Sequence, residues 1–153
     1  WDYMMDLSLK GYFFACQKAS KEMVKRGTKG SLICISSVHS FRAAENWTPY
    51  GIAKIGVRRM VKGLAADLAN TGINSNCIAP GAINNTIPED DKVEPEAMDM
   101  PWVPSGRQGL PSDISNAVIF LSSKMGEYVN GETILVDGGL IATGLGVGRP
   151  DGK

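Results

Sequence analysis

Two kinds of apolar pattern alternate along the chain. The first places apolar residues three and four positions apart, which predicts amphipathic helices. These segments are residues 1–26, 50–72 and 111–123. The second is a short run of mostly apolar residues, which predicts a strand in a buried sheet. These runs are residues 31–36, 73–81 and 131–139. Residues 82–112 are polar with little periodicity, which predicts a long loop.

Residues that start or stop helices agree with these bounds. The first helix is expected to end in "KRGTKG", because basic residues followed by glycine are typical of a helix C-terminus. The second is expected to follow Pro49, whose fixed φ suits a helix start, and to end on "NTG", residues 70–72. For the third helix, Ser112 is the expected N-cap, and Asp113 is favoured by the helix dipole.

The order of these elements predicts an α/β fold. Strands separated by helices form parallel sheets through right-handed crossover connections. A sheet of three strands is small, and we expect one of its edges to be buried rather than bare. The chain also begins with Trp1 instead of methionine. We therefore expect either that a segment was removed or that residues 1–153 are one half of a larger doubly wound domain.

Composition excludes several classes of function. The 16 basic residues equal the 16 acidic ones, so charge gives no reason to expect a nucleic-acid or anionic membrane partner. The apolar runs are far shorter than a membrane span. Cys16, Cys34 and Cys77 are odd in number and widely spaced. This pattern predicts reduced thiols in a cytoplasmic protein, without a disulfide framework or a metal site.

Candidate chemistry lies where the first strand and the second helix meet. Tyr50 and Lys54 are four residues apart and therefore share a helix face, where an ammonium favours a phenolate. Alone, this spacing is more typical of a surface pair. However, Ser37 follows a buried strand, the position at which open α/β sheets bind ligands. The next strand ends at Gly81, which permits close backbone approach. We expect these elements to converge on one cleft.

The segments around these residues resemble the short-chain dehydrogenase/reductase family over nearly the whole chain. The similar segments are "WDYMMDLSLKGYFF", "GSLICISSVHS", "YGIAKIGVRRMVKGLAADLANTGINSNCIAPGAI", "SGRQGLPSDISNAVIFLSS" and "YVNGETILVDGG". Within the family, "SSVH" and "APGAIN" look most like glucose 1-dehydrogenases. The resemblance implies the C-terminal half of a Rossmann-like doubly wound parallel sheet. Its N-terminal strands and glycine-rich dinucleotide loop would precede Trp1.

The family's roles carry over to matching positions. The resemblance implies that Tyr50 is the general acid/base, that Lys54 lowers its proton affinity and holds the nicotinamide ribose, and that Ser37 hydrogen-bonds the substrate oxygen. It also implies a nicotinamide site lined by Pro80, Gly81 and Ile83. The expected reaction interconverts an alcohol, with sugars or polyols as first candidates, and a carbonyl. The expected cofactor is NAD or NADP. Both stay open, because residues beyond the second strand of the complete fold usually select between them.

Other positions depart from the family or keep a simpler interpretation. Ser8 stands where the family has an asparagine of its proton relay, and Asn85 where it has a threonine. Ser8 supports an alternative from a different class, a catalytically silent assembly or binding protein. A second alternative, within the same family, is a ketone or acyl-thioester reductase. We interpret Ser36 as structural and His39 as a residue at the rim of the cleft. Residues 84–107 are expected to form a lid.

Assembly is the last expectation. The helices predicted over 2–26 and 50–70 carry apolar residues on more than one face, which calls for a second partner for each helix. In the family that this chain resembles, the corresponding helices pair across a two-fold axis, which implies a homotetramer. The alternative is that an N-terminal half covers these surfaces.

Overall fold

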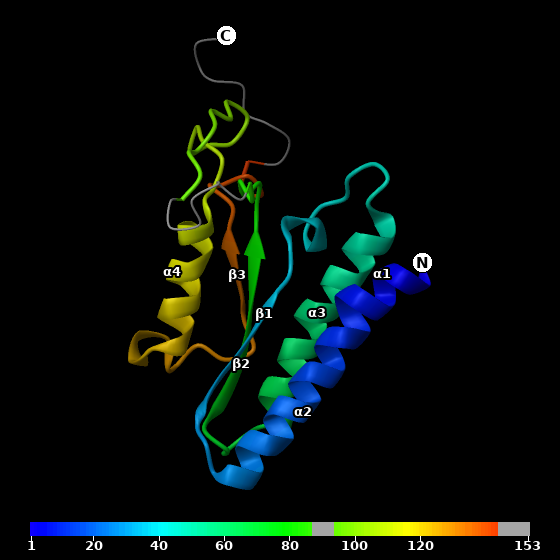
Figure 1. Ribbon diagram of the computed structural model, residues 1–153, viewed down its shortest axis with the longest axis vertical. Helices are drawn as coiled ribbons and strands as arrows, with labels where there is room; N and C mark the ends of the chain where they lie inside the picture. The colour runs from blue at the N-terminus through cyan, green and yellow to red at the C-terminus, as the bar shows by residue number, and fades with distance from the viewer. Residues whose placement is uncertain (87–93, 144–153) are drawn as a thin grey trace.

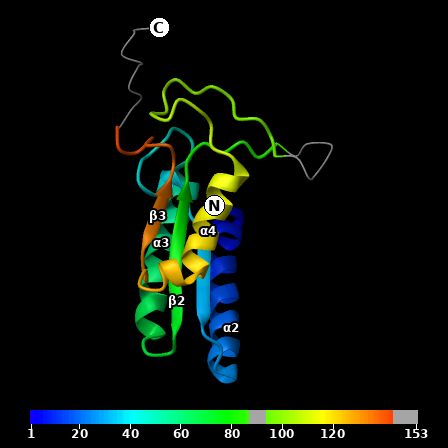
Figure 2. The same ribbon diagram turned by 90° about the vertical axis from the view of Figure 1, so that its left-hand side faces the viewer.

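A three-stranded parallel sheet lies between two layers of helices (Figures 1 and 2). The computed structural model describes residues 1–86 and 94–143. The strands are β1 (Gly30–Ile35), β2 (Ile73–Pro80) and β3 (Thr133–Val136), in the order β1-β2-β3. Helices α2 and α3 cover one face of the sheet, and α4 covers the other. The predicted α/β class with three parallel strands is confirmed.

The middle strand, β2, forms the centre of the sheet. It pairs with β1 in the register Cys34 to Cys77, and with β3 in the register Ile78 to Ile134. Most of β2 is buried because helices cover both of its faces. The strand predicted over 131–139 is too long. Gly131 and Gly138 have φ of 78° and 62°, a conformation that turns the chain out of the sheet on both sides of β3.

The N-terminal helix is interrupted, whereas the sequence pattern predicted one continuous helix over 1–26. Helix α1 (Asp2–Met5) leads into a π-helical turn, η1 (Asp6–Lys10), and then into α2 (Gly11–Arg26). In the turn, the Gly11 N–H reaches back five residues to the Asp6 carbonyl. A Cβ at Gly11 would lie 3.3 Å from that oxygen, so glycine suits the wide turn. The predicted stop is confirmed at Gly27, which has a φ of 64°.

Helix α3 (Thr48–Asp67) begins two residues before the predicted start. Pro49 therefore lies in the first turn instead of ahead of it, where its missing N–H would have no intrahelical partner. The helix ends at Asp67, five residues before the expected end. Asn70 and Gly72, with φ of 63° and 76°, then turn the chain into β2.

The main hydrophobic core lies between the sheet and the helices α2 and α3. It consists of the buried residues Cys16, Leu32, Cys34, Val57, Val61, Leu68, Ile73 and Cys77. Val57 and Val61, with the partly buried Met60 and Leu64, come from one face of α3 at the three- and four-residue spacing that the sequence shows. This packing fixes the start of α3 beside the carboxyl end of β1.

Helix α4 (Pro111–Ser122) corrects one prediction, because Ser112 is not its N-cap. The cap position is Leu110, whose N–H donates to the Asp113 carboxylate over 2.8 Å. Pro111 comes first in the helix because it has no N–H that needs a partner. Arg107 makes two hydrogen bonds to the same carboxylate, of 2.8 and 2.9 Å. These bonds from Arg107, followed by that from Leu110, lower the pKa of Asp113.

Gly81 provides a test of how closely β2 and β3 approach. A Cβ at this position would lie 2.7 Å from the Asp137 Cα, which is backbone and cannot rotate away. We expect Gly81→Ala to lower the free energy of unfolding by about 1–3 kcal/mol, measured by urea denaturation.

Gly63→Ala in α3 is the matched control for Gly81→Ala. Its Cβ would meet only the Arg59 side chain, at 3.7 Å. It should stabilise the protein by about 1 kcal/mol, because alanine favours helix. Equal effects of the two substitutions would contradict the close approach at Gly81.

Candidate active site

The serines that follow β1 are held in different environments. Ser37 precedes a short 3₁₀ turn, η2 (Val38–Ser40), and its Oγ accepts a hydrogen bond from the His39 N–H over 3.2 Å. Ser36 turns inward, where its Oγ donates to the Lys54 carbonyl over 3.0 Å. Ser40 fixes the turn, because its Oγ donates to the Ser37 carbonyl over 2.6 Å. Ser36 therefore joins β1 to α3, while the Ser37 hydroxyl still has its own proton to donate.

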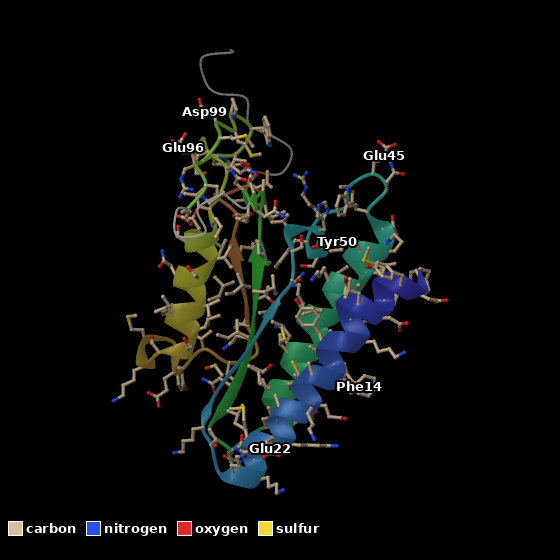
Figure 3. The ribbon with its side chains drawn as sticks, in the orientation of Figure 1. Phe14, Glu22, Glu45, Tyr50, Glu96 and Asp99 are labelled. Carbon is tan, nitrogen blue, oxygen red and sulfur yellow. The ribbon has the colours of Figure 1, made fainter. Side chains whose placement is uncertain are left out.

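Tyr50 lies in the first turn of α3, close to the carboxyl end of β1 (Figure 3). Two other aromatic rings hold its ring edge-on: Trp47 at 5.3 Å and His39 at 5.8 Å between ring centroids. His39 and Trp47 in turn stack on each other at 4.9 Å. Burial, followed by the charge of Arg42, lowers the pKa of His39. His39 therefore packs beside Tyr50 and also lines a neighbouring cavity, and its lowered pKa makes it a weaker base than a free imidazole.

Lys54 is a buried cation behind Tyr50. Its side chain lies one turn further along α3, and only 7% of the residue is exposed. The ammonium donates to the Ile35 carbonyl over 3.0 Å and lies 5.5 Å from the centre of the Tyr50 ring. Burial lowers the pKa of Lys54, because removal from water disfavours its charged form. The structure thus brings the predicted pair together in a partly desolvated place.

The predicted residues Pro80, Gly81 and Ile83 lie at the carboxyl end of β2. Pro80 ends the strand, and the Gly81 N–H donates to the Val136 carbonyl over 3.0 Å. Ile83 lines a cavity of about 430 Å³ together with Arg107, Asp137 and other residues. Ser37, Tyr50 and Lys54 do not line this cavity. The six predicted site residues therefore form two groups. Ser37, Tyr50 and Lys54 lie at the carboxyl end of β1, and Pro80, Gly81 and Ile83 lie at the carboxyl end of β2.

The first group can support proton transfer. A half-buried phenol beside a desolvated ammonium and a hydroxyl with a free proton can move a proton and polarise an oxygen atom. The described residues contain no group of three or more His, Cys, Asp or Glu side chains that could hold a metal ion. Within the same part of the chain, no helix is long and apolar enough to cross a membrane.

Comparison with known proteins decides the family. A family model described as enoyl-(acyl carrier protein) reductase matches residues 1–141. The chain belongs to the short-chain dehydrogenase/reductase family. It is 40% identical over 146 residues to the 2-dehydro-3-deoxy-D-gluconate 5-dehydrogenase of Escherichia coli, covering 93% of this chain and 57% of that protein. It is 41% identical over 138 residues to the L-rhamnose-1-dehydrogenase of Scheffersomyces stipitis, covering 89% and 54%.

A solved member of the family has the same fold. The gluconate 5-dehydrogenase of Burkholderia cenocepacia, in complex with NADP and tartrate, matches with a TM-score of 0.76 and 36% identity. The match covers 90% of this chain and 55% of that one. The chain therefore spans about half the length of the relatives that it matches. This likeness confirms the predicted Rossmann-like class, with the part present here lying at the C-terminal side.

Sequence reasoning missed two features of the short-chain dehydrogenase/reductase site. The first is Tyr12, whose ring centre lies 5.0 Å from the Lys54 ammonium, nearer than that of Tyr50. Its spacing of four residues from Ser8 places both on one helix face and could have drawn attention to it. The second is the π turn, which has no clear sequence signal. In that turn the Ser8 Oγ contacts the Met4 sulfur at 3.4 Å.

The residues present fit the nicotinamide end of a dinucleotide. The Gly81 backbone packs directly against Asp137, where an added Cβ would lie 2.7 Å from the Asp137 Cα, so the missing side chain lets the chain turn at the end of β2. Within the described residues, the Lys54 ammonium donates to one acceptor, the Ile35 carbonyl, and it has two further protons to donate. Such donors suit ribose hydroxyl groups.

Proposed function

We propose that this chain forms the catalytic C-terminal part of an NAD(P)-dependent oxidoreductase that interconverts an alcohol and a carbonyl. One observation carries the proposal: the buried ammonium of Lys54 lies 5.5 Å from the Tyr50 ring, directly behind the serine-bearing end of β1. Family membership supports it. Because the relatives are about twice as long, the activity belongs to the full-length protein that contains this chain.

In this proposal, each side chain has one task. The nicotinamide, when bound, accepts or supplies the hydride. Tyr50 takes the proton from the substrate hydroxyl, or returns it to the carbonyl oxygen. Lys54 stabilises the phenolate through its charge, which is strong because its surroundings are desolvated. Ser37 donates its hydroxyl proton to the substrate oxygen, since its Oγ already accepts from His39.

The same residues would hold the nicotinamide end of NAD or NADP. Tyr50 and Lys54 would bind the ribose, while Pro80, Gly81 and Ile83 would line the ring. The main chain after β2 is held in place for this, because the Gly109 N–H donates to the Ala82 carbonyl over 2.9 Å. The residues that select between NAD and NADP lie in the preceding half of the fold.

We propose sugars, sugar acids or polyols as the substrate class. Two of the similar proteins are named as dehydrogenases of sugar-derived substrates, and "SSVH" and "APGAIN" resemble glucose 1-dehydrogenases. The rim of His39 and Trp47 is consistent with this class, because aromatic faces and a ring nitrogen suit a polyhydroxylated ligand. Reduction of ketones or acyl thioesters is the alternative within the family.

Absorbance of reduced nicotinamide tests this function. Full-length protein would be mixed with each oxidised cofactor and a panel of aldoses, aldonic acids and secondary alcohols. In the reverse direction the panel would contain ketones and acyl thioesters. We expect the largest signal with a sugar-derived alcohol. If the protein binds cofactor but gives no signal with any compound, the result would support the alternative based on Ser8, a catalytically silent protein.

The proposed setting is the cytoplasm, without a nucleic-acid or membrane partner. The balanced charge of 16 basic and 16 acidic residues supports the absence of such partners. The three free cysteines support a reducing compartment. Fractionation of cells that produce the full-length protein would test the location.

We further propose that the full-length protein is a homotetramer. Helices α1, α2 and α3 and the π turn η1 expose large apolar side chains, and Figure 3 shows Phe14 pointing away from the sheet. The exposed residues are Tyr3, Leu7, Phe13, Phe14, Ile52 and Ile55. Such apolar faces are typical of interfaces between subunits. The homotetramer of the resembled family, with two-fold symmetry, accounts for them.

Phe13→Arg tests the assembly. An arginine that is desolvated without a partner disfavours association, so light scattering at micromolar concentration should show a smaller species than the unsubstituted protein. Tyr128→Arg is the control, because Tyr128 is fully exposed beyond α4 and should leave the mass unchanged. A monomeric mass for the unsubstituted protein would contradict the tetramer and favour coverage by an N-terminal half.

A further inference from the structure

Two thiols face each other in the core behind the candidate site. Cys16 lies on α2 and Cys34 on β1, and their sulfur atoms are 3.5 Å apart. Both are free and buried, with 8% and 2% of the residue exposed. The contact joins residues 18 positions apart in the chain and connects a helix to a strand.

The geometry favours this pair over the third cysteine. Cys77 is the register partner of Cys34 on β2 and is also buried, but its sulfur is placed toward the Ile78 carbonyl, 3.8 Å away. A disulfide has a sulfur–sulfur bond of about 2.05 Å, so the Cys16 and Cys34 sulfurs need to approach by about 1.5 Å. Closing this gap draws β1 and α2 toward each other.

The hydrogen bond also gives the two thiols different reactivities. It lowers the pKa of Cys16, because a thiolate there accepts the bond from Cys34. The same bond, followed by burial, raises the pKa of Cys34. Cys16 is also the more exposed of the two residues, at 8% against 2%, so it is assigned as the thiol that a peroxide reaches first. This is the arrangement of an attacking thiol with a resolving thiol.

We propose that Cys16 and Cys34 form an oxidisable dithiol, which a hydroperoxide converts into a disulfide between α2 and β1. The Cys16 thiolate attacks the peroxide, which breaks the O–O bond and gives a sulfenic acid and an alcohol or water. The Cys34 sulfur then attacks the sulfenic sulfur, and water leaves. Two thiols are oxidised, one peroxide is reduced, and both thiol protons end in the released products.

The disulfide would act on the candidate site through the strand. Cys34 lies three residues before Ser37, and Lys54 hydrogen-bonds to Ile35 between them. Drawing Cys34 toward α2 therefore shifts the segment that carries the site. Misplacement of reacting groups by about 1 Å costs up to about 100-fold in rate. This consequence for activity rests on the proposed oxidoreductase function, whereas the cross-link itself does not.

The first experiment detects the cross-link without an activity assay. Full-length protein, unsubstituted and native, would be treated with hydrogen peroxide, alkylated, digested without reductant and mapped by mass spectrometry. We expect a peptide pair that joins Cys16 to Cys34, lighter than the two thiol peptides by two hydrogen atoms. Thiols that resist oxidation until denaturant is added would overturn the proposal, and so would a cross-link from Cys34 to Cys77.

Variants and activity complete the test. Cys77→Ala should keep the cross-link and Cys16→Ala should lose it. With the cross-link formed, we expect turnover to fall at least about threefold and to recover after addition of dithiothreitol. Unchanged turnover in cross-linked protein would overturn the link to the site. A protein without activity in either state would count against the proposed function, while the mapped cross-link would still support the dithiol.

Discussion

Tyr50→Phe should lower the turnover of the full-length protein by about 10²–10⁴-fold, because it removes the hydroxyl that would exchange the substrate proton. The remaining ring keeps its edge-on contacts with Trp47 and His39. It also stays beside the Lys54 ammonium, 5.5 Å from the ring centre. We therefore expect the thermal midpoint of unfolding to stay unchanged while steady-state turnover collapses.

Tyr128→Phe is the matched control for Tyr50→Phe. Tyr128 is fully exposed after α4, so removal of its hydroxyl should change neither turnover nor stability. Turnover of Tyr50→Phe within about threefold of the unsubstituted protein would exclude Tyr50 as the acid/base.

Ser37→Ala should lower turnover by about 10²–10³-fold, the usual effect of removing one donor to a developing negative charge. Among the described residues, the Ser37 Oγ accepts from the His39 N–H of its own turn, so the substitution removes this one local hydrogen bond. Most of the backbone support for that turn comes from Ser40 and should persist. The expected loss therefore concerns turnover rather than folding.

Ser36→Ala should give the opposite result. Its Oγ joins β1 to α3 through the Lys54 carbonyl, and the side chain is buried. Its loss should lower the free energy of unfolding by about 1 kcal/mol, measured in urea, with turnover nearly unchanged. If Ser36→Ala abolishes turnover and Ser37→Ala does not, the substrate contact belongs one residue earlier in the chain.

The fold class was predictable because local periodicity and chain order determine it. Helical spacing in "YGIAKIGVRRMV" indicates a helix, and the short apolar run "SLICIS" indicates a strand. Strands that alternate with helices along the chain form a parallel sheet. The element ends were less predictable. Ser112 looks like an N-cap, yet Asp113 and Pro111 together move the start of α4. Several residue types can end a helix, and tertiary contacts select among them.

The candidate site was predictable to a similar extent. Tyr50 and Lys54 belong to one helix, so their proximity follows from the helical repeat alone. Ser37 approaches them because β1 and α3 meet through the buried face of α3, which the apolar spacing also indicates. The depth of Lys54 was not predictable. Its burial involves α2, a separate helix that precedes β1 in the chain and places Tyr12 over the ammonium.

The sequence by itself determined which elements form and which side chains share a helix face or a strand end, since those relations repeat over a few residues. Tertiary structure alone decided the contacts between segments that are distant in the chain. These include the ring of Tyr12 beside the Lys54 ammonium and the facing thiols of Cys16 and Cys34. The physical reason is that a periodic pattern gives the direction of a side chain, whereas a contact also requires the position of the opposing element.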